Sequence, residues 1–273
     1  MKVLCVICAR SGSKGIKNKN LTNFFGKPLI SHTINQAKKI KFTNIVVSTD
    51  SKKISKIAGY KYSWFLRSKK LSGDKISKIK VIVDALSKSE KKFKIKYDVV
   101  IDLDVTSPLR LEKDIRKAMK IFIKKNYDNI FSVCEASRNP YFNMVEIINK
   151  KVCLSKNKKV FYSRQTAPQV YDMNAAIYIW KRDILLKNKS LFSKKTGIYI
   201  MPKNRSIDID DKLDYKIVNV QITKLLPTIE GFASIVITNK SQIGVDVRNV
   251  DLKLFLDNVE MGSVLQTKTT SIK

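Results

Sequence analysis

Residues 3–20 read Val-Leu-Cys-Val-Ile-Cys-Ala-Arg-Ser-Gly-Ser-Lys-Gly-Ile-Lys-Asn-Lys-Asn, so an apolar run passes directly into a loop of glycine, serine and basic residues. A buried strand that opens into such a loop is typical of the phosphate pockets of α/β proteins. Gly12 and Gly15 let backbone N–H groups approach an anion closely. Three side chains add positive charge: Arg10, Lys14 and Lys19. The loop therefore predicts binding of a triphosphate or a similar polyanion, and the alternative interpretation is a basic surface turn.

Apolar runs alternate with amphipathic segments beyond this loop. Strands are expected at 2–8, 44–49, 62–66, 97–103, 129–135, 174–180 and 197–201. Apolar residues at helical spacing predict helices near 28–39, 54–58, 76–86, 115–122 and 212–226. This alternation predicts an α/β fold with a doubly wound, mostly parallel sheet that is covered on both faces. Ligands of such sheets bind beyond the carboxyl ends of the strands.

Two segments break the alternation. Residues 137–173 are expected to form a small hairpin-like insertion that serves as a lid or a subunit contact. Residues 228–273 separate as a C-terminal extension of unknown role, which leaves 1–227 as the main domain. The sequence holds no apolar run of about 18 residues that would predict a membrane span. The four cysteines do not suggest a disulfide framework, so a cytoplasmic location is expected.

The formal net charge of the 273 residues is +31, which invites a nucleic-acid interpretation. The lysines, however, are scattered along helices and loops throughout the chain. No stretch interleaves them with aromatic residues in a single binding segment. We therefore expect nonspecific affinity for anions but no specific nucleic-acid partner.

A second signal is the acidic segment Ser-Ile-Asp-Ile-Asp-Asp at 206–211. In an extended strand, Asp208 and Asp210 share one face while Ile207 and Ile209 pack inward. Two carboxylates on one face repel each other unless a cation lies between them. Mg²⁺ takes one or two carboxylates, keeps waters and bridges to substrate phosphates. Alongside a triphosphate loop, the pair predicts a magnesium site, whereas taken alone it could equally be a solvated strand end before a helix cap.

Other polar residues follow the ends of the predicted strands. Asp104, Thr106 and Ser107 come directly after an apolar strand and could hold substrate hydroxyls, or could form a turn and a helix cap. An arginine such as Arg164 suits a substrate carboxylate. Asn174, at the start of a strand, could bind sugar hydroxyls. By themselves, Arg164 and Asn174 could equally be ordinary surface residues.

Taken in order, these segments resemble the cytidylyltransferases that activate sialic acids and related nonulosonates, over residues 1–226. The matching motifs are Ala-Arg, two variable residues and Ser-Lys-Gly at 9–15, Lys-Asn at 19–20, Gly-Lys-Pro-Leu-Ile at 26–30, Val-Val-Ser-Thr-Asp at 46–50, Arg67 with Leu71 and Asp74, Thr-Ser-Pro-Leu-Arg at 106–110, Arg-Gln at 164–165, Asn-Ala-Ala-Ile-Tyr at 174–178, and Ser-Ile-Asp-Ile-Asp at 206–210. The resemblance implies a Rossmann-like fold and a nucleotidyltransferase that uses CTP and Mg²⁺ and releases pyrophosphate. It also implies a homodimer whose insertion reaches into the partner's active site.

The resemblance also implies roles for individual residues. The CTP-binding set is Arg10, Ser13, Lys14, Gly15, Lys19 and Asn20 for the triphosphate, with Arg67 and Ser77 near the cytosine or the ribose. The set expected at the acid sugar is Asp104, Thr106, Arg164, Gln165 and Asn174. The catalytic set is Arg10 and Lys19 together with the metal ligands Asp208 and Asp210.

The chain departs from the family pattern in informative places. The sialic-acid enzymes carry Gln-Pro before Thr-Ser-Pro-Leu-Arg, and that glutamine contacts the sugar, whereas this chain has Asp104 and Val105. A carboxylate near an anionic sugar repels it unless a cation or an amino substituent intervenes. The departure disfavours N-acetylneuraminate and leaves the identity of the nonulosonate open. In addition, Ser68 replaces a proline, and Ala175 replaces the glycine of Asn-Gly-Ala.

These features together predict a CMP-sugar synthetase. The anomeric hydroxyl of a nine-carbon 2-keto acid sugar is expected to attack the α-phosphorus of CTP and displace pyrophosphate. Two alternatives are kept. One is a synthetase of the Kdo type that acts on an eight-carbon acid sugar, and the other is a non-catalytic protein that binds nucleotides or nucleic acid.

Overall fold

The computed structural model describes residues 1–13, 15–156, 159, 161–187 and 190–225, together with 245–247, 250–256, 259–266 and 270–272. The chain divides into two compact units, Met1–Val218 and Asn219–Lys273. The first unit contains the sheet and the candidate site. Within the described part of the chain, no helix combines the length and the apolar character that crossing a bilayer requires.

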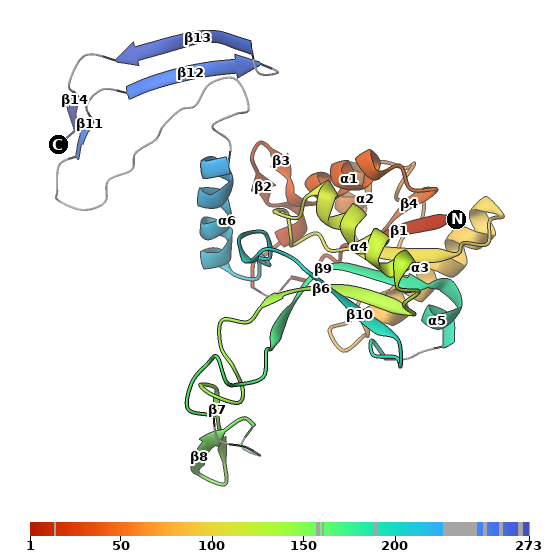
Figure 1. Ribbon diagram of the computed structural model, residues 1–273. Helices are drawn as coiled ribbons and strands as arrows, with labels where there is room; N and C mark the ends of the chain where they lie inside the picture. The colour runs from red at the N-terminus through yellow and green to blue at the C-terminus, as the bar shows by residue number, and fades with distance from the viewer. Residues whose placement is uncertain are drawn as a thin grey trace. The chain divides into compact units, whose positions relative to one another are not determined.

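Six strands form the central sheet in the order β10-β6-β9-β5-β1-β4 (Figure 1). Their bounds are β1 Val3–Cys8, β4 Asn44–Ser48, β5 Val99–Leu103, β6 Asn129–Glu135, β9 Tyr171–Lys181 and β10 Thr196–Ile200. β1 runs parallel to β4 and β5, and β10 runs parallel to β6, whereas β9 is antiparallel to β5 and β6. The predicted α/β fold with a mostly parallel sheet is confirmed. The antiparallel strand arises because β6 returns through the insertion rather than through a crossover helix.

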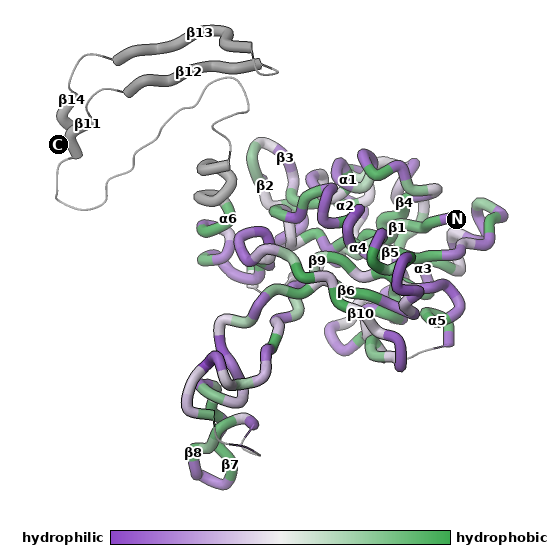
Figure 2. The backbone as a smooth tube through the Cα atoms, viewed as in Figure 1, coloured by the Kyte–Doolittle hydropathy of each residue, from purple (hydrophilic) through white to green (hydrophobic). Residues whose placement is uncertain are grey.

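Helices cover both faces of this sheet. Their bounds are α1 Leu29–Ile40, α2 Lys52–Ala58, α3 Lys78–Phe93, α4 Glu112–Lys124 and α5 Arg182–Lys187. α3 and α5 pack over the face of β1 that presents Leu4 and Val6. Cys5 and Ile7, which point to the opposite face of β1, are also fully buried. Figure 2 shows hydrophobic residues concentrated in the central strands, whereas the helices around them mix hydrophilic and hydrophobic residues.

Shorter elements complete the fold. Before the second unit they are η1 Lys19–Leu21, β2 Asn23–Phe24, β3 Lys27–Pro28, η2 Lys69–Leu71, β7 Val145–Ile148, β8 Lys151–Leu154 and η3 Lys203–Arg205. α6 spans Lys212–Leu225, and the second unit continues with β11 Val245–Val247, β12 Val250–Leu256, β13 Val259–Gln266 and β14 Thr270–Ile272. The predicted hairpin-like insertion contains the antiparallel pair β7 and β8. The predicted strand-like stretch at 231–237 lies outside the described residues.

The strand predicted at 62–66 is wrong. Only one isolated bridge forms there, between Leu66 and Thr49, and the segment otherwise follows the edge of β4 without strand pairing. Trp64 and Phe65 pack against the buried cluster under α3 instead. The apolar character of this segment therefore serves packing, which an apolar run shorter than a helix does not distinguish from sheet pairing.

A buried arginine fixes the loop that follows β5. Arg110 is completely buried, and its guanidinium donates to the carbonyl oxygens of Asp104 at 3.1 Å and Ala176 at 2.6 Å and to Gln36 Oε1 at 2.8 Å. These bonds tie the loop to β9 and to α1. Burying a charge costs much less when it is hydrogen-bonded. These bonds leave Arg110 Nε without a partner among the described residues, and they fix the backbone of Asp104 at the carboxyl end of β5.

A second polar contact fixes the segment that follows β10. Arg205 binds the buried Asp114 of α4 through two hydrogen bonds of 2.7 and 3.0 Å, and Tyr199 donates to the same carboxylate at 2.9 Å. Burial alone raises the pKa of Asp114, but these bonds and one from the backbone of Leu111 lower it below its usual value. Because the pKa is lowered, this carboxylate stabilises the fold above pH about 4 and loses that effect as the pH falls further.

We predict that Arg205→Met destabilises the protein by about 3 kcal/mol at pH 7, because it leaves the Asp114 carboxylate buried without its cation. The loss should shrink at acid pH, where the carboxyl group becomes protonated and neutral. Urea unfolding at pH 7 and pH 4 measures both effects. Lys203→Met, at an exposed position in the same turn, is the matched control, and an equal loss in the two variants would contradict the role given to the Arg205 contact.

Candidate active site

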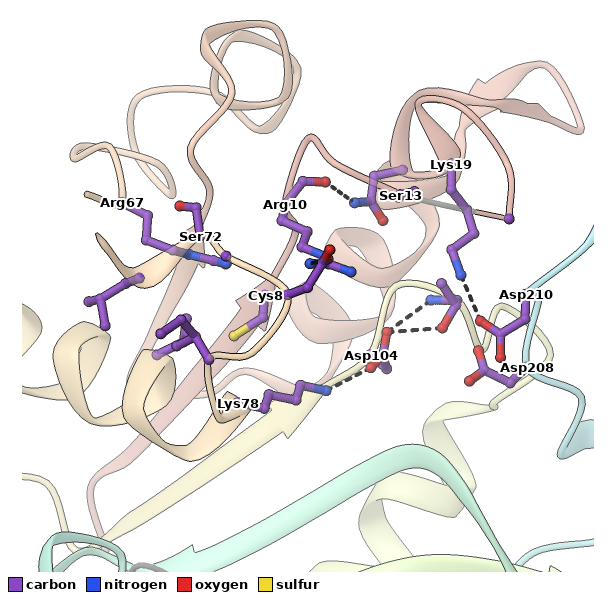
Figure 3. Close-up of a pocket in the computed structure, with 18 residues that line it drawn as sticks. Cys8, Arg10, Ser13, Lys19, Arg67, Ser72, Lys78, Asp104, Asp208 and Asp210 are labelled. Atoms are coloured by element: carbon purple, nitrogen blue, oxygen red, sulfur yellow. Dashed lines mark hydrogen bonds and ion pairs between the residues drawn. The ribbon is translucent and has the colours of Figure 1, made fainter. Parts of the chain in front are cut away.

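A pocket of about 580 Å³ lies beyond the carboxyl ends of β1 and β5 (Figure 3). It brings together residues of four segments that are far apart in the sequence. The predicted site residues that line it are Arg10, Ser13, Gly15, Lys19, Asn20, Arg67, Asp104, Thr106, Asp208 and Asp210. Lys14 lies outside the described residues. The pocket position agrees with the general location of ligand sites in open parallel sheets.

The loop after β1 is held at both ends. Asn20 is buried, and its side-chain amide donates to the carbonyl oxygen of Arg10 at 2.9 Å. The backbone N–H and the hydroxyl of Ser11 both donate to Asp50, each at 2.8 Å. The loop cations face carboxylates: Arg10 pairs with Asp74, and Lys19 Nζ lies 2.9 Å from Asp210 Oδ1. A polyanion in the pocket would meet these two cations.

Gly15 makes the closest approach between this loop and the acidic segment. A Cβ atom at Gly15 would lie 2.1 Å from the backbone oxygen of Asp210, far inside contact distance. Gly12 has open space at the corresponding position. The two glycines of the loop therefore differ: only Gly15 is required by packing, because it lets the loop lie directly against the backbone that carries Asp210.

Gly15→Ala should separate the loop from the acidic segment and reduce turnover by about 10²-fold, comparable to the loss of one electrostatic contact to a developing charge. Gly12→Ala is the matched control, since its methyl group meets no atom within 4 Å. Initial rates of the two variants at saturating substrates make the comparison. Equal rates would show that the Gly15 contact is not needed for function.

The acidic segment is extended but does not pair as a strand. Ile209 is completely buried, and its N–H donates to the carbonyl oxygen of Thr106 at 2.9 Å. This anchor places Asp208 and Asp210 on either side of a buried residue, with both lining the pocket. The expected alternation of Asp208 and Asp210 around the inward Ile209 is therefore present, although the expected strand is not.

The two carboxylates differ in their surroundings. The Asp210 side chain is 75% exposed and contacts Lys19. Asp208 Oδ1 is buried and has no hydrogen-bond partner in the described part of the chain. Burial, followed by the nearby Asp104 carboxylate, raises the pKa of Asp208 to about 6. A buried, unpartnered carboxylate oxygen fits a cation ligand, because an added positive charge would remove the cost of ionising it.

Asp208 and Asp210 offer a metal ion two carboxylates, which fits an ion that also binds substrate phosphates. Among the described residues, no group of three or more His, Cys, Asp or Glu side chains is arranged to hold a metal ion. Mg²⁺ commonly binds through one or two carboxylates plus substrate phosphates and waters. Asp208 and Asp210 match that requirement, whereas they do not form a complete protein cage.

Asp208→Asn is expected to raise the melting temperature in EDTA at pH 7.5 by about 3–6 °C, because the change removes a buried charge. The raised pKa means that stability falls as the pH rises from about 4 to about 6. At pH 5 the wild-type carboxyl group is already largely protonated, so the gain should be smaller. Scanning calorimetry at the two pH values tests this, and an equal gain at both would contradict the assignment.

The pocket floor holds a lysine that sequence reasoning missed. Lys78 Nζ lies 2.6 Å from Asp102 Oδ2 and 2.6 Å from Asp104 Oδ2. Burial lowers the pKa of Lys78, but the two carboxylates outweigh it and raise the pKa well above its usual value. Burial likewise raises the pKa of Asp104, but Lys78 and two hydrogen bonds from Thr106 lower it to about 2. Lys78 is therefore the cation that offsets the negative charge of Asp104 in this pocket.

The prediction that Ser77 lies near the nucleoside differs from the structure. Ser77 is exposed, precedes the first residue of α3 and does not line the pocket, whereas Lys78 does. Arg67 is brought to the pocket as expected. Its Nε donates to Ser48 Oγ at 3.1 Å, and its Nη2 donates to the carbonyl oxygen of the same serine. The sequence signal for Lys78 was a basic residue at the start of a predicted helix in a chain with Asp102 and Asp104 at a strand end.

Three predicted sugar ligands lie away from the pocket. Arg164 and Gln165 line a separate hollow of about 350 Å³ at the base of the insertion, with Arg138 and Asn139. Asn174 is buried, and its amide group is occupied by protein: Nδ2 donates to Ser206 Oγ at 2.8 Å and Oδ1 accepts from Ser132 Oγ at 2.7 Å. Direct sugar binding by Asn174 is therefore corrected to positioning, because its bonds hold the segment that leads to Asp208.

Comparisons with known proteins identify the family of this chain and agree with its fold. A family model described as cytidylyltransferase matches residues 4–235. The post-translational flagellin modification protein B of Campylobacter coli is 48% identical over 225 residues, which cover 81% of this chain and 95% of that protein. The CMP-N,N'-diacetyllegionaminic acid synthase of Campylobacter jejuni subsp. jejuni is 46% identical over 226 residues, again 81% and 95%.

A solved structure shows the same fold at low sequence identity. It is the CMP:2-keto-3-deoxy-manno-octonic acid synthetase complexed with CTP, with a TM-score of 0.60 and 16% identity. The match covers 83% of this chain and all of that one. At this level of identity the likeness concerns the arrangement of strands and helices alone.

Proposed function

The chain belongs to the cytidylyltransferase family, and we propose that it transfers CMP from CTP to the anomeric hydroxyl of a nonulosonic acid, with release of pyrophosphate. The observation that carries this proposal is the convergence of the basic loop and the acidic pair on one pocket, with Lys19 2.9 Å from Asp210. The relative that is 46% identical is named for a product of this kind, which supports a nine-carbon acid sugar as acceptor.

The loop side of the pocket receives the triphosphate of CTP. Arg10 and Lys19 supply positive charge, and Ser13 and Gly15 lie beside them on the same wall. Both cations contact carboxylates in the protein alone, so phosphate oxygens replace those partners when CTP binds. Charge builds up on the departing pyrophosphate, and cations fixed in advance stabilise it without further reorganisation. Arg67, held rigidly by Ser48, faces the nucleoside.

The acidic side of the pocket holds Mg²⁺ through Asp208 and Asp210, and the ion offsets phosphate charge when bound. The anomeric oxygen forms a bond to the α-phosphorus, the bond from that phosphorus to the bridging oxygen breaks so that pyrophosphate leaves, and the hydroxyl group gives its proton to water. The chain contributes position and charge rather than a covalent intermediate. Asp104 and Thr106 line the same wall and face the acid sugar.

The carboxylate of the sugar is held by the insertion of a second copy of the chain. Arg164 and Gln165 lie in the insertion and away from the pocket of their own chain. The hairpin of that insertion exposes large apolar side chains, among them Ile147 at 74% and Val152 at 70%. Contiguous exposed apolar surface of this kind supports burial against another protein surface. A homodimer would bring each Arg164 to the other copy's pocket.

Pyrophosphate release from CTP, measured with a panel of 2-keto acid sugars, tests the proposed reaction. Activity with one or more nine-carbon acids is expected, and no activity is expected without sugar. If only an eight-carbon acid is used, the acceptor is misassigned. If no acid sugar releases pyrophosphate while CTP still binds, the proposed transfer is wrong.

Asp210→Asn and Lys19→Ala should each lower turnover by about 10²-fold at saturating substrates, because each removes charge that stabilises the reacting phosphates. Asp183→Asn is the matched control, since the Asp183 side chain is 67% exposed on α5 and its carboxylate pairs with the adjacent Arg182. Near-normal turnover of Asp210→Asn at saturating Mg²⁺ would overturn the metal assignment. An effect of Lys19→Ala confined to sugar affinity would show that the loop is misassigned.

A further inference from the structure

The pocket floor carries a cation that faces protein groups on several sides. Lys78 Nζ contacts Asp102 and Asp104, each at 2.6 Å, and lies 5.3 Å from the centre of the Tyr178 ring. An ammonium group has three N–H donors, and two carboxylates and an aromatic face surround this one. Lys78 therefore contacts two carboxylates, whereas Arg10 and Lys19 each pair with one in the described part of the chain, and it serves as the fixed partner of the two.

The Asp104 carboxylate is held in one position. Oδ2 accepts from Lys78, and Oδ1 accepts from the N–H and the hydroxyl of Thr106 at 3.2 and 3.0 Å. Its backbone carbonyl accepts from Arg110, and its N–H donates to the carbonyl oxygen of Ala176. Its side chain remains 21% exposed and lines the pocket. An ionised carboxylate offers only acceptor sites, so a ligand atom that meets it must be a hydrogen-bond donor.

We propose that Lys78 and Asp104 form a selectivity pair, and this inference rests on the proposed function. Lys78 fixes the Asp104 carboxylate at the pocket wall. That carboxylate accepts a hydrogen bond from an amide N–H of an acylamino group on the acid sugar. Asp104 is then a specificity-determining residue, and Lys78 is a positioning residue that acts through it (Figure 3).

The chemistry of the pocket favours this donor. The sugar carboxylate and the phosphates of CTP are anions, and a fixed carboxylate repels them, so Asp104 faces a neutral part of the acid sugar. Hydrogen bonds from neutral donors to a charged acceptor are stronger than those between neutral groups. The relative that is 46% identical is named for a sugar with two N-acetyl groups, each of which carries one amide N–H. A site built around such a donor rejects an analogue that lacks it, because the acceptor is then left unpaired.

The test replaces the donor and the acceptor in turn. The substrates are an N,N'-diacetylated nonulosonic acid and two analogues in which one acetamido group at a time becomes an acetoxy group, which keeps the acyl group and removes the N–H. The full chain is compared with Asp104→Asn, Lys78→Met and, as a matched control on the same helix, Lys80→Met at an exposed position. kcat/KM for each sugar, KM for CTP, and the thermal shift caused by CTP are measured.

Wild type should disfavour one acetoxy analogue by about 10- to 100-fold, and Asp104→Asn should reduce that ratio to about threefold or less. Lys78→Met should reduce the same ratio, while Lys80→Met should keep it. The Asp104→Asn side chain has the same shape as the original, so it tests the pairing even if Lys78→Met does not fold, and the thermal shift by CTP shows which variants retain the nucleotide site.

Two results would overturn the pairing while leaving the proposed function intact. One is wild-type activity with the diacetylated sugar but the same analogue ratio in Asp104→Asn. The other is an unchanged ratio together with a raised Mg²⁺ requirement in Asp104→Asn, which would make Asp104 a metal ligand. Wild-type enzyme that binds CTP but is inactive with every acid sugar would instead overturn the proposed function, and the pairing with it.

Discussion

Carboxylates crowd together at the carboxyl edge of the sheet, and the site depends on the cations that hold them there. Asp102 and Asp104 share Lys78, and Asp210 contacts Lys19. Asp208 Oδ1 is buried without a hydrogen-bond partner among the described residues, and so is Asp102 Oδ1. Like charges at this separation raise each other's pKa unless opposite charge compensates. The protein therefore places a cation beside Asp102, Asp104 and Asp210, whereas burial and the nearby Asp104 raise the pKa of Asp208, which an added cation would lower.

This crowding is maintained by a frame of buried polar contacts rather than by apolar packing alone. Arg110 ties the Asp104 loop to β9 and α1, Asn174 ties β6 to the segment before Asp208, and Arg205 ties that segment to α4. Hydrogen bonds are directional, and a buried donor left unpaired is costly. Each contact therefore fixes one relative position of the two segments that it joins, whereas an apolar contact would allow small shifts between them. The frame sets the distances between carboxylates that the chemistry needs.

Local signals in the sequence were sufficient for the first strand, its basic loop and the pair Asp208 and Asp210, because each depends on neighbouring residues. The rest depends on contacts between distant segments. The segment at 62–66 has the composition of a strand but packs on α3. Side chains of successive helical residues point about 100° apart. At the start of α3, Lys78 therefore faces the pocket, whereas the neighbouring Ser77 was expected there. Asn174 has a polar side chain suited to a sugar, but Ser132 of β6 and Ser206 after η3 bind both of its polar atoms.

Because the net charge is +31, the carboxylates in the pocket matter more for selecting a ligand than they would in a protein with few surface cations. Exposed lysines attract any polyanion, but the attraction is screened over about 8–10 Å in physiological salt and does not distinguish one anion from another. Selection requires groups that penalise the wrong ligand. In the proposed function Asp104 and Asp208 have this role, because an anion that brings neither a hydrogen-bond donor nor a divalent cation meets carboxylate oxygens, which can only accept hydrogen bonds. The abundant surface charge thus aids encounter, and the few fixed carboxylates decide which encounter is productive.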